Sequence, residues 1–436
     1  MNSPIPCLLL LLSLGHTLRA ELPRLTVSQN HRALTTVEGA PFFYLGDTAW
    51  ELFHKLTRED ASAYLQDRAS KGFTVVDWVL VLDDVARSYP PPGDTMASFF
   101  QPPAEYAGKL GGYLSPLQFY DGRPVKDAAD WPARRQEILE KWHGLLGPWP
   151  PLIERPRMER VESKLRENFT QHRIRLEAAP GQMFDGYLLV PEGRGPFPAV
   201  VVPYYDAETS VGLKSELRDF ALQLTRRGFV SLAIGAPGGD ARQPELGAAR
   251  CQPLSYLGYL AANCYNALAA MPEVDGRRVG IVGHSYGGKW AMFGACLYDK
   301  FACAVWSDPG IVFDEARGSV NYWEPWYLGL EPGRTRKAGL ITGASPRTGA
   351  YAQLIEQGRD LHELHALMAP RPFLVSGGSE DFPARWVALN HAVAVNSLLG
   401  CKDRVAMTNR PAHPPTAESN EQIYEFFAHF LQPTKP

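Results

Sequence analysis

The chain has 436 residues, of which 45% are hydrophobic and 21% charged. These proportions exclude intrinsic disorder and coiled coil for most of the chain. Its 44 Lys and Arg residues nearly balance 47 Asp and Glu residues, and a net charge of −3 gives no indication of nucleic-acid binding. The length suits either two to three domains or one large α/β domain with extensions.

An apolar run at the N-terminus, Cys7–Leu14, is too short to span a bilayer and is followed by a small-residue site that ends at Ala20. This pattern predicts a secretory signal peptide over residues 1–20, and hence a secreted or periplasmic protein. Since no other stretch has the about 18 apolar residues of a spanning helix, we expect no membrane contact after cleavage.

The six cysteines are scattered and form no C-x-x-C pair. Five would remain after cleavage, so we expect buried thiols rather than a disulfide framework, and no structural zinc. His362 and His365 are three residues apart without a third ligand, which does not make a metal site. We expect neither a metal nor a cofactor.

A Pro- and Gly-rich stretch over residues 86–118 interrupts the regular pattern. It predicts an N-terminal extension over residues 21–114, comprising a small α/β unit and this irregular segment. The catalytic domain is predicted over residues 115–436.

In this second part, short apolar runs alternate with amphipathic patterns. Residues 173–177 and 184–190 are expected to form a hairpin entering a sheet. Buried strands are predicted at 199–204, 229–234, 278–282, 301–306, 371–376 and 404–408. Helices are predicted at 214–227, 254–271, 288–297, 360–368, 384–399 and 418–431. This order predicts a mostly parallel sheet with helices on both faces and a ligand site at the carboxyl ends of its strands.

Residues 279–290 read V-G-I-V-G-H-S-Y-G-G-K-W, an apolar strand that enters G-x-S-x-G and then a helix. A nucleophilic serine needs this sharp turn to present its oxygen, and Gly283 and Gly287 permit the close packing. The sequence therefore predicts Ser285 as the nucleophile. The Tyr286 amide, at the start of the helix, is predicted to donate to an oxyanion.

The general base is expected after the last strand, where His413 lies between prolines in N-R-P-A-H-P-P-T. For the acid that orients it, we prefer Asp381 in G-G-S-E-D-F-P, after the preceding strand. The alternatives are its neighbour Glu380 and Asp308, which ends an earlier strand in A-V-W-S-D-P-G. The chain order Ser285, Asp381, His413 is that of α/β-hydrolases, so we predict that fold.

The predicted chemistry is acyl transfer through an acyl-enzyme that water cleaves. A second oxyanion donor is expected in the loop P-Y-Y-D-A-E-T-S, from the amide of Tyr205 or Asp206. The aromatic segment N-Y-W-E-P-W-Y offers Trp323 and Trp326 as candidates for stacking on sugar rings. The alternative interpretation of this segment is a small core that holds an insertion together.

Several motifs carry a family resemblance: P-L-Q-F-Y-D-G-R-P-V-K, F-D-G-Y-L-L-V-P, G-H-S-Y-G-G-K and L-H-E-L-H-A-L-M-A-P-R-P-F-L-V. Through them residues 115–436 resemble secreted microbial α/β-hydrolases related to acetyl xylan esterases and glucuronoyl esterases. Glucuronoyl esterases carry G-C-S-R-x-G-K, whose lysine contacts sugar hydroxyls, so the resemblance implies a substrate-binding role for Lys289. Tyr286 stands where those enzymes have an oxyanion-stabilising arginine.

Residues 28–82 resemble a different family, through L-G-D-T-A-W-E-L-F-H-K-L-T and the sequence after it. The similarity is to the start of apiosidase-like barrel glycoside hydrolases. One or two βα units cannot close an eight-stranded barrel, so we assign no glycosidase activity to this fragment.

The sequence as a whole predicts a serine carboxylesterase that removes ester groups from polysaccharides or oligosaccharides, of the acetyl xylan, glucuronoyl or feruloyl type. One alternative is a serine peptidase of the prolyl oligopeptidase type. The other is a non-catalytic carbohydrate-binding protein on a hydrolase scaffold. The expected partner is a carbohydrate ester, and the sequence does not indicate an oligomeric state.

Overall fold

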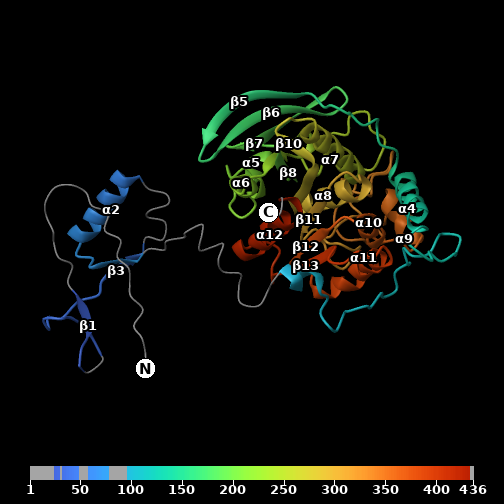
Figure 1. The fold of residues 1–436 in the computed structure, drawn as a ribbon. Coiled ribbons are helices and arrows are strands. Elements are labelled where there is room, and N and C mark those ends of the chain that lie inside the picture. The colour runs from blue at the N-terminus through green and yellow to red at the C-terminus, as the bar shows by residue number, and fades with distance from the viewer. Residues whose placement is uncertain (1–23, 30–31, 49–56, 78–95, 433–436) are drawn as a thin grey trace. The chain divides into compact units, whose positions relative to one another are not determined.

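The computed structural model describes the chain apart from residues 1–23, 30–31, 49–56, 78–95 and 433–436 (Figure 1). The chain divides into two compact units, Met1–Pro90 and Pro91–Pro436. The predicted signal peptide lies outside the described residues. Within the described ranges, no helix has both the length and the apolar character needed to cross a membrane.

The first unit contains a short hairpin and one βαβ element. Its members are β1 (Leu25–Val27), β2 (Leu34–Thr36), β3 (Gly46–Thr48), α2 (Arg58–Ser70) and β4 (Val75–Asp77). β1 and β2 pair antiparallel, whereas β3 and β4 pair parallel on either side of α2. Helix α2 begins where the Thr57 hydroxyl accepts a hydrogen bond from the Asp60 amide at 3.2 Å. The described part of this unit thus contains one βαβ element of the kind from which barrels are built.

The second unit begins earlier than the sequence predicts. The 3₁₀ helix η1 (Met96–Phe100) buries Phe99 in the same core cluster as the C-terminal helix. Further along, the Asn390 side chain donates to the carbonyls of Tyr106 and Lys109, both at 2.8 Å. Residues 96–114, predicted to belong with the extension, therefore pack as part of the hydrolase unit.

A large sheet dominates the second unit. Its strands are β5 (Met158–Arg166), β6 (Phe169–Ala179), β7 (Gln182–Pro191), β8 (Phe197–Pro203), β9 (Val230–Ile234), β10 (Val274–His284), β11 (Cys303–Ser307), β12 (Phe373–Gly377) and β13 (Val405–Asn409). They lie in the order β13-β12-β11-β10-β8-β9-β7-β6-β5. β8 to β13 run parallel to one another, whereas β7, β6 and β5 each run antiparallel to their neighbours. The predicted mostly parallel sheet is confirmed.

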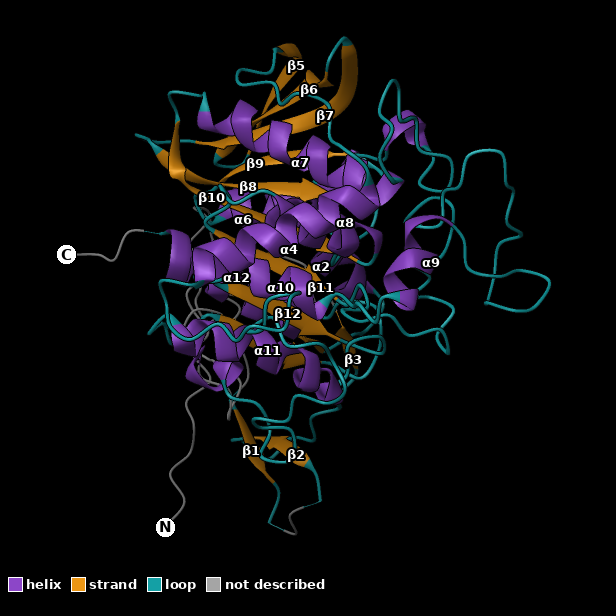
Figure 2. Ribbon diagram, turned by 90° about the vertical axis from the view of Figure 1, so that its right-hand side faces the viewer, coloured by secondary structure: helices purple, strands orange, loops and turns teal. Residues whose placement is uncertain are grey.

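Helices cover both faces of this sheet (Figures 1 and 2). One face packs against α4 (Trp131–Leu146), α7 (Pro253–Ala269), α8 (Tyr286–Leu297), α9 (Gly349–Glu356), α10 (His362–Leu367) and α11 (Trp386–Leu398). The other packs against η1, α5 (Ala207–Ser210), α6 (Phe220–Arg226) and α12 (Ala417–Leu431). Two further 3₁₀ turns are η2 (Pro237–Gly239) and η3 (Pro383–Arg385). α6 is shorter than the predicted helix 214–227, because Leu217 has a positive φ of 61°.

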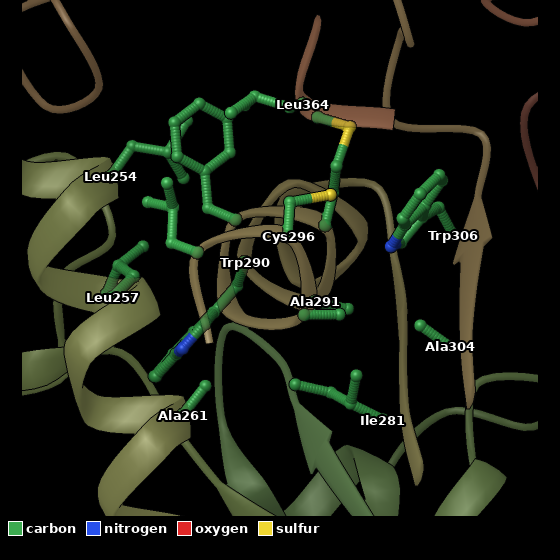
Figure 3. Close-up of a cluster of buried hydrophobic side chains, with 14 of the residues drawn as sticks. Leu254, Leu257, Ala261, Ile281, Trp290, Ala291, Cys296, Ala304, Trp306 and Leu364 are labelled. Atoms are coloured by element: carbon green, nitrogen blue, oxygen red, sulfur yellow. The ribbon is translucent and has the colours of Figure 1, made fainter. Parts of the chain in front are cut away.

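Strand residues alternate between the two cores, as a sheet covered on both faces requires. In β8, Ala199 and Val201 face the α7–α8 side, whereas Val200 and Val202 face the α6–α12 side. On the first side α7 and α8 approach closely, since a Cβ on Gly294 would lie 2.7 Å from the Ala261 methyl (Figure 3). This close packing fixes α8, the helix that follows the predicted nucleophile.

Candidate active site

Ser285 lies on a strained turn between β10 and α8. Its φ of 56° and ψ of −114° fall in a region that residues other than glycine rarely adopt. The amide of Ser285 donates to the Ser307 carbonyl of the neighbouring strand at 2.8 Å, and the Lys289 amide donates to the Ser285 carbonyl at 3.0 Å. The turn is thus anchored on both sides, at the carboxyl end of the sheet.

The glycines around Ser285 are required by close backbone contacts. A Cβ on Gly283 would lie 2.1 Å from the Gly287 carbonyl oxygen, and one on Gly287 would lie 2.2 Å from the Pro203 carbonyl oxygen. Neither position has room for a side chain, because backbone atoms cannot rotate away. The G-x-S-x-G pattern is therefore accounted for by the geometry of a nucleophile turn.

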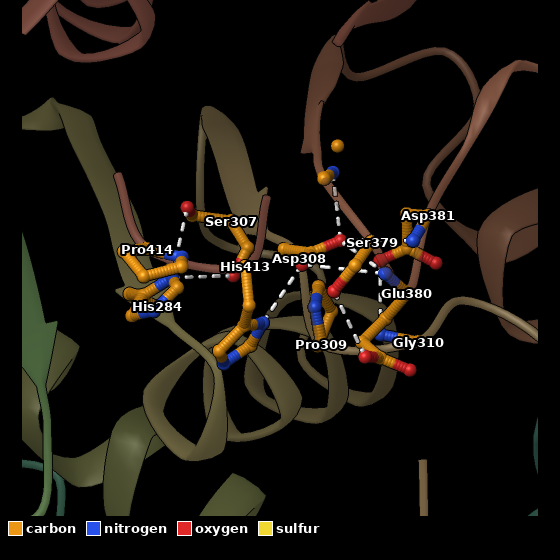
Figure 4. A network of polar contacts seen from close by, with 12 residues as sticks. His284, Ser307, Asp308, Pro309, Gly310, Ser379, Glu380, Asp381, His413 and Pro414 are labelled. Atoms are coloured by element: carbon orange, nitrogen blue, oxygen red, sulfur yellow. Dashed lines mark hydrogen bonds and ion pairs between the residues drawn. The ribbon is translucent and has the colours of Figure 1, made fainter. Parts of the chain in front are cut away.

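The acid beside His413 is Asp308, and the structure corrects the preferred choice of Asp381. His413 Nδ1 lies 2.7 Å from Asp308 Oδ2 (Figure 4). The Asp381 carboxylate instead accepts the amides of Gly310 at 2.9 Å and Ile311 at 2.6 Å. The reason is the register of the sheet: β11 and β12 are adjacent, so acids at both strand ends reach the same place.

The side chain of Asp308 is bound by the loop after β12, which contains Asp381, the acid preferred from the sequence. Its Oδ1 accepts the backbone amides of Gly378 at 2.7 Å, Asp381 at 2.8 Å and Glu380 at 3.1 Å. The side chain of Asp308 is fully buried, so these three bonds replace the hydrogen bonds to water that it would make if exposed. Glu380 contributes its amide, and its carboxylate accepts from Ser379 at 3.0 Å.

Two buried side chains, those of Arg410 and His284, contact the loop or the ring of His413. Neither was singled out from the sequence. Arg410 donates to the carbonyls of His413 at 2.7 Å and Pro414 at 2.9 Å, which fixes the loop. The ring of His284 lies 4.6 Å from that of His413. Burial, and next the electrostatic interaction with His413, hold the pKa of His284 well below its usual value, so His284 is neutral beside the predicted base.

The two predicted oxyanion donors are neighbours. The rings of Tyr205 and Tyr286 are 4.8 Å apart and inclined by 30°. Within the described part of the chain, neither backbone amide has a hydrogen-bond acceptor, so both are available to a ligand. Asp206, the alternative donor, uses its carboxylate to cap α5 by accepting the Thr209 amide at 2.9 Å.

The three side chains predicted to bind sugar differ in their burial. Lys289 and Trp323 are buried, with Lys289 Nζ donating to the Pro309 carbonyl and Trp323 Nε1 donating to the Gly339 carbonyl at 2.8 Å. Burial contradicts the prediction that these two side chains contact substrate. Trp326 is half-buried beside Arg242, whose Cζ lies 5.8 Å from the ring centroid, so its role stays a prediction.

A groove with a volume of about 810 Å³ lies beside Tyr205, where β7 begins and β9 ends. The carboxylates that line it are those of Glu162, Asp185, Asp206, Glu208 and Glu245. Of the described residues in this lining, Arg173 is the only cation. Lys214, outside this lining, forms ion pairs with Asp206 at 3.1 Å and Glu208 at 3.7 Å, so the excess of negative charge comes from Glu162, Asp185 and Glu245.

The histidine pair on α10 binds backbone. His362 Nε2 donates to the Leu114 carbonyl at 2.6 Å, and His365 Nε2 donates to the Ile311 carbonyl at 2.8 Å. Among the described residues, no group of three or more His, Cys, Asp or Glu side chains is arranged to hold a metal ion.

Comparison with solved structures identifies the fold. A glucuronoyl esterase from Solibacter usitatus is similar at 18% identity and a TM-score of 0.58, over 73% of this chain and 98% of that one. A promiscuous CE15 esterase from a marine bacterial metagenome is similar at 17% identity and a TM-score of 0.56, over 77% and 99%. The second unit has the α/β-hydrolase fold. The predicted likeness to glucuronoyl esterases is thereby confirmed at the level of the fold.

Two family models match separate parts of the chain. A model described as esterase FrsA-like matches residues 159–314, which include Ser285 and Asp308. A model described as the catalytic domain of apiosidase-like proteins matches residues 28–106, which confirms the second predicted resemblance. A search of curated proteins gave no match.

Proposed function

We propose that the protein is a serine carboxylesterase that hydrolyses ester groups on carbohydrates. The observation that carries this proposal is the 2.7 Å contact between His413 and Asp308, at the same sheet edge as the strained Ser285 turn. The esterase family match over residues 159–314 and the fold of the glucuronoyl esterases support it.

In this mechanism Asp308 holds the His413 proton on Nδ1, which leaves Nε2 unprotonated and able to act as the base. Nε2 takes the Ser285 proton as Oγ attacks the ester carbonyl. The amides of Tyr286 and Tyr205 stabilise the tetrahedral oxyanion. His413 then gives its proton to the leaving alcohol, and the C–O bond of the ester breaks. Water, deprotonated by the same nitrogen, cleaves the acyl-enzyme to release the acid and restore Ser285.

The groove beside Tyr205 supports a carbohydrate as the bound portion of the ester. It is large enough for one or more sugar rings, and carboxylates accept hydrogen bonds from sugar hydroxyls. Its excess of negative charge disfavours a uronate, so we propose an ester on an uncharged sugar as the preferred substrate. Secretion, as indicated by the N-terminal sequence, fits a substrate outside the cell.

A panel of esters tests this function. The wild type and Ser285→Ala would be assayed with p-nitrophenyl acetate, acetylated xylo-oligosaccharides, a feruloyl sugar and a methyl glucuronate. We expect hydrolysis and an acyl-enzyme burst by the wild type and loss of both in the variant. A folded wild type that cleaves no ester would contradict the proposal. Carbohydrate binding without turnover would then favour the non-catalytic alternative, and cleavage of peptides would favour the peptidase.

A further inference from the structure

Lys289 is buried in an unusual position for a cation. It lies in the first turn of α8, where the positive end of the helix dipole disfavours a positive charge, and only 3% of its surface is exposed. Burying an ammonium group is costly unless nearby groups stabilise it. The contacts of Nζ therefore indicate the role of this side chain.

These contacts converge on the turn that follows Asp308. Nζ of Lys289 donates to the Pro309 carbonyl. It also lies 4.8 Å from the ring centroid of Tyr322, whose hydroxyl donates to the next carbonyl, that of Gly310, at 2.7 Å. The lysine and the tyrosine thus contact each other and bind two consecutive carbonyls directly after the acid.

The surroundings of Nζ account for the burial of the charge. The ring of Tyr327 lies 5.6 Å from it, and two aromatic faces stabilise a cation at short range. Burial lowers the pKa of Lys289 to about 8, and the carboxylates of Asp381, Glu380 and Asp308 oppose that shift. The charge of the lysine therefore interacts with the carboxylates around Asp308.

The turn needs this support because its backbone is strained. Asp308 has a φ of 50°, which is unfavourable for a residue with a side chain. Each neighbouring peptide group is fixed by a side chain. Besides the two carbonyls bound by Lys289 and Tyr322, Asp381 accepts the Gly310 and Ile311 amides.

We propose that Lys289 is a positioning residue that ties the helix of the nucleophile to the turn of the acid, and that it does not bind substrate. The proposal rests on the proposed function. Through Pro309, the lysine holds Asp308 at the distance from α8 at which His413 is oriented toward Ser285.

Kinetics with two esters test the proposal, using Lys289→Met and Lys289→Gln. p-Nitrophenyl acetate has no sugar hydroxyls, whereas an acetylated xylo-oligosaccharide has several. A positioning role predicts that kcat falls by the same factor on both esters, roughly ten- to a hundredfold for Lys289→Met, with KM unchanged. Lys289→Gln keeps an N–H donor and should retain more of kcat. A higher KM for the sugar ester alone, or unchanged kcat in a folded variant, would overturn the proposal.

A matched variant of the partner side chain provides a second test. Tyr322→Phe keeps the ring and removes the hydroxyl that binds Gly310, so kcat should again fall equally on both esters. The double variant with Lys289→Gln should lose less than the product of the two single losses, because both act on one turn. If the loss of kcat in the double variant equals the product of the two single losses, the two side chains do not share this role. Labelling of Ser285 by a fluorophosphonate separates the two proposals, since a folded wild type that is not labelled would refute the proposed function itself.

Discussion

Asp308 and Asp381 each bind the backbone of the other's loop. The Asp308 carboxylate accepts amides of the loop after β12, including that of Asp381 at 2.8 Å. The Asp381 carboxylate accepts two amides of the turn after β11, at 2.9 and 2.6 Å. Two acids that the sequence offers as alternatives are therefore parts of one arrangement, in which Asp308 reaches His413 and Asp381 supports Asp308.

This arrangement predicts unequal effects of removing the two charges. Asp308→Asn places a neutral group on His413 Nδ1 and should lower kcat by roughly 10³- to 10⁴-fold. Asp381→Asn disturbs the turn without contacting His413, so a loss of roughly ten- to a hundredfold is expected. Steady-state kinetics with p-nitrophenyl acetate measures both.

Glu380→Gln is the matched control, because Glu380 binds Asp308 through its backbone amide and should keep nearly full activity. A loss in Asp381→Asn as large as that in Asp308→Asn would show that Asp381 acts directly on the base. Thermal unfolding of each variant separates such a loss from misfolding.

Burial, and next the charge of Asp308, raise the pKa of Asp381 to about 7. The folded protein therefore binds this proton more tightly than the unfolded chain, whose carboxyl has a pKa near 3.9. Because the native state holds more protons between these values, the free energy of unfolding should fall as pH rises from about 4 to 7, by up to about 1.4 kcal/mol per pH unit.

Urea unfolding of the wild type and Asp381→Asn across this pH range measures the effect. The difference in unfolding free energy between the two proteins should change with pH in that window and level off above it. A constant difference would show that Asp381 is ionised throughout. His413→Ala, measured in parallel, shows whether the base contributes to the slope.

Arg410 holds the base loop through its planar fork of donors. It contacts the carbonyls of Ser376 at 2.9 Å, His413 at 2.7 Å and Pro414 at 2.9 Å. Lysine cannot bind several carbonyls in this geometry. Arg410→Lys should therefore lower kcat by roughly tenfold or more, with little change in KM for p-nitrophenyl acetate.

Arg404→Lys is the control for Arg410→Lys, since Arg404 lies directly before β13, at the opposite end from Arg410, and donates to the Asp403 carbonyl at 3.3 Å. It should behave as the wild type does. Equal activity of both variants would mean that the prolines around His413 fix the loop without Arg410.

The elements around the site could be predicted because they are strongly patterned. The parts of β10 and β11 that lead into Ser285 and Asp308 are mostly apolar, and the predicted segments 278–282 and 301–306 overlap these two strands. β5 was missed, because most of its residues are exposed on an edge strand and show no apolar face.

The choice of acid could not be made from the sequence, for a physical reason. Asp308 directly follows β11 and Asp381 lies in the loop after β12. Because Ser307 pairs with Ser376 across the sheet, both acids reach the same edge. Which one contacts His413 depends on side-chain directions and turn conformation, which no spacing encodes. The burial of Lys289 could not be predicted from the sequence either, because Tyr322 and Tyr327, which cover it, come from an insertion later in the chain.

The charge of the groove predicts how the protein distinguishes sugars. The carboxylates of Glu162 and Glu245 line the groove beside Tyr205 and should repel an acidic oligosaccharide. The double variant Glu162→Gln, Glu245→Gln should therefore lower KM several-fold for an acetylated oligosaccharide that carries a free uronate. Its KM for the uncharged counterpart should change much less, because the glutamine side-chain oxygen still accepts hydrogen bonds from sugar hydroxyls. Because salt screens exposed charges, the difference should shrink as ionic strength rises. Glu192→Gln is the control, because Glu192 is exposed and lies outside the groove lining. If the double variant changes KM equally for both substrates, the sugar binds elsewhere.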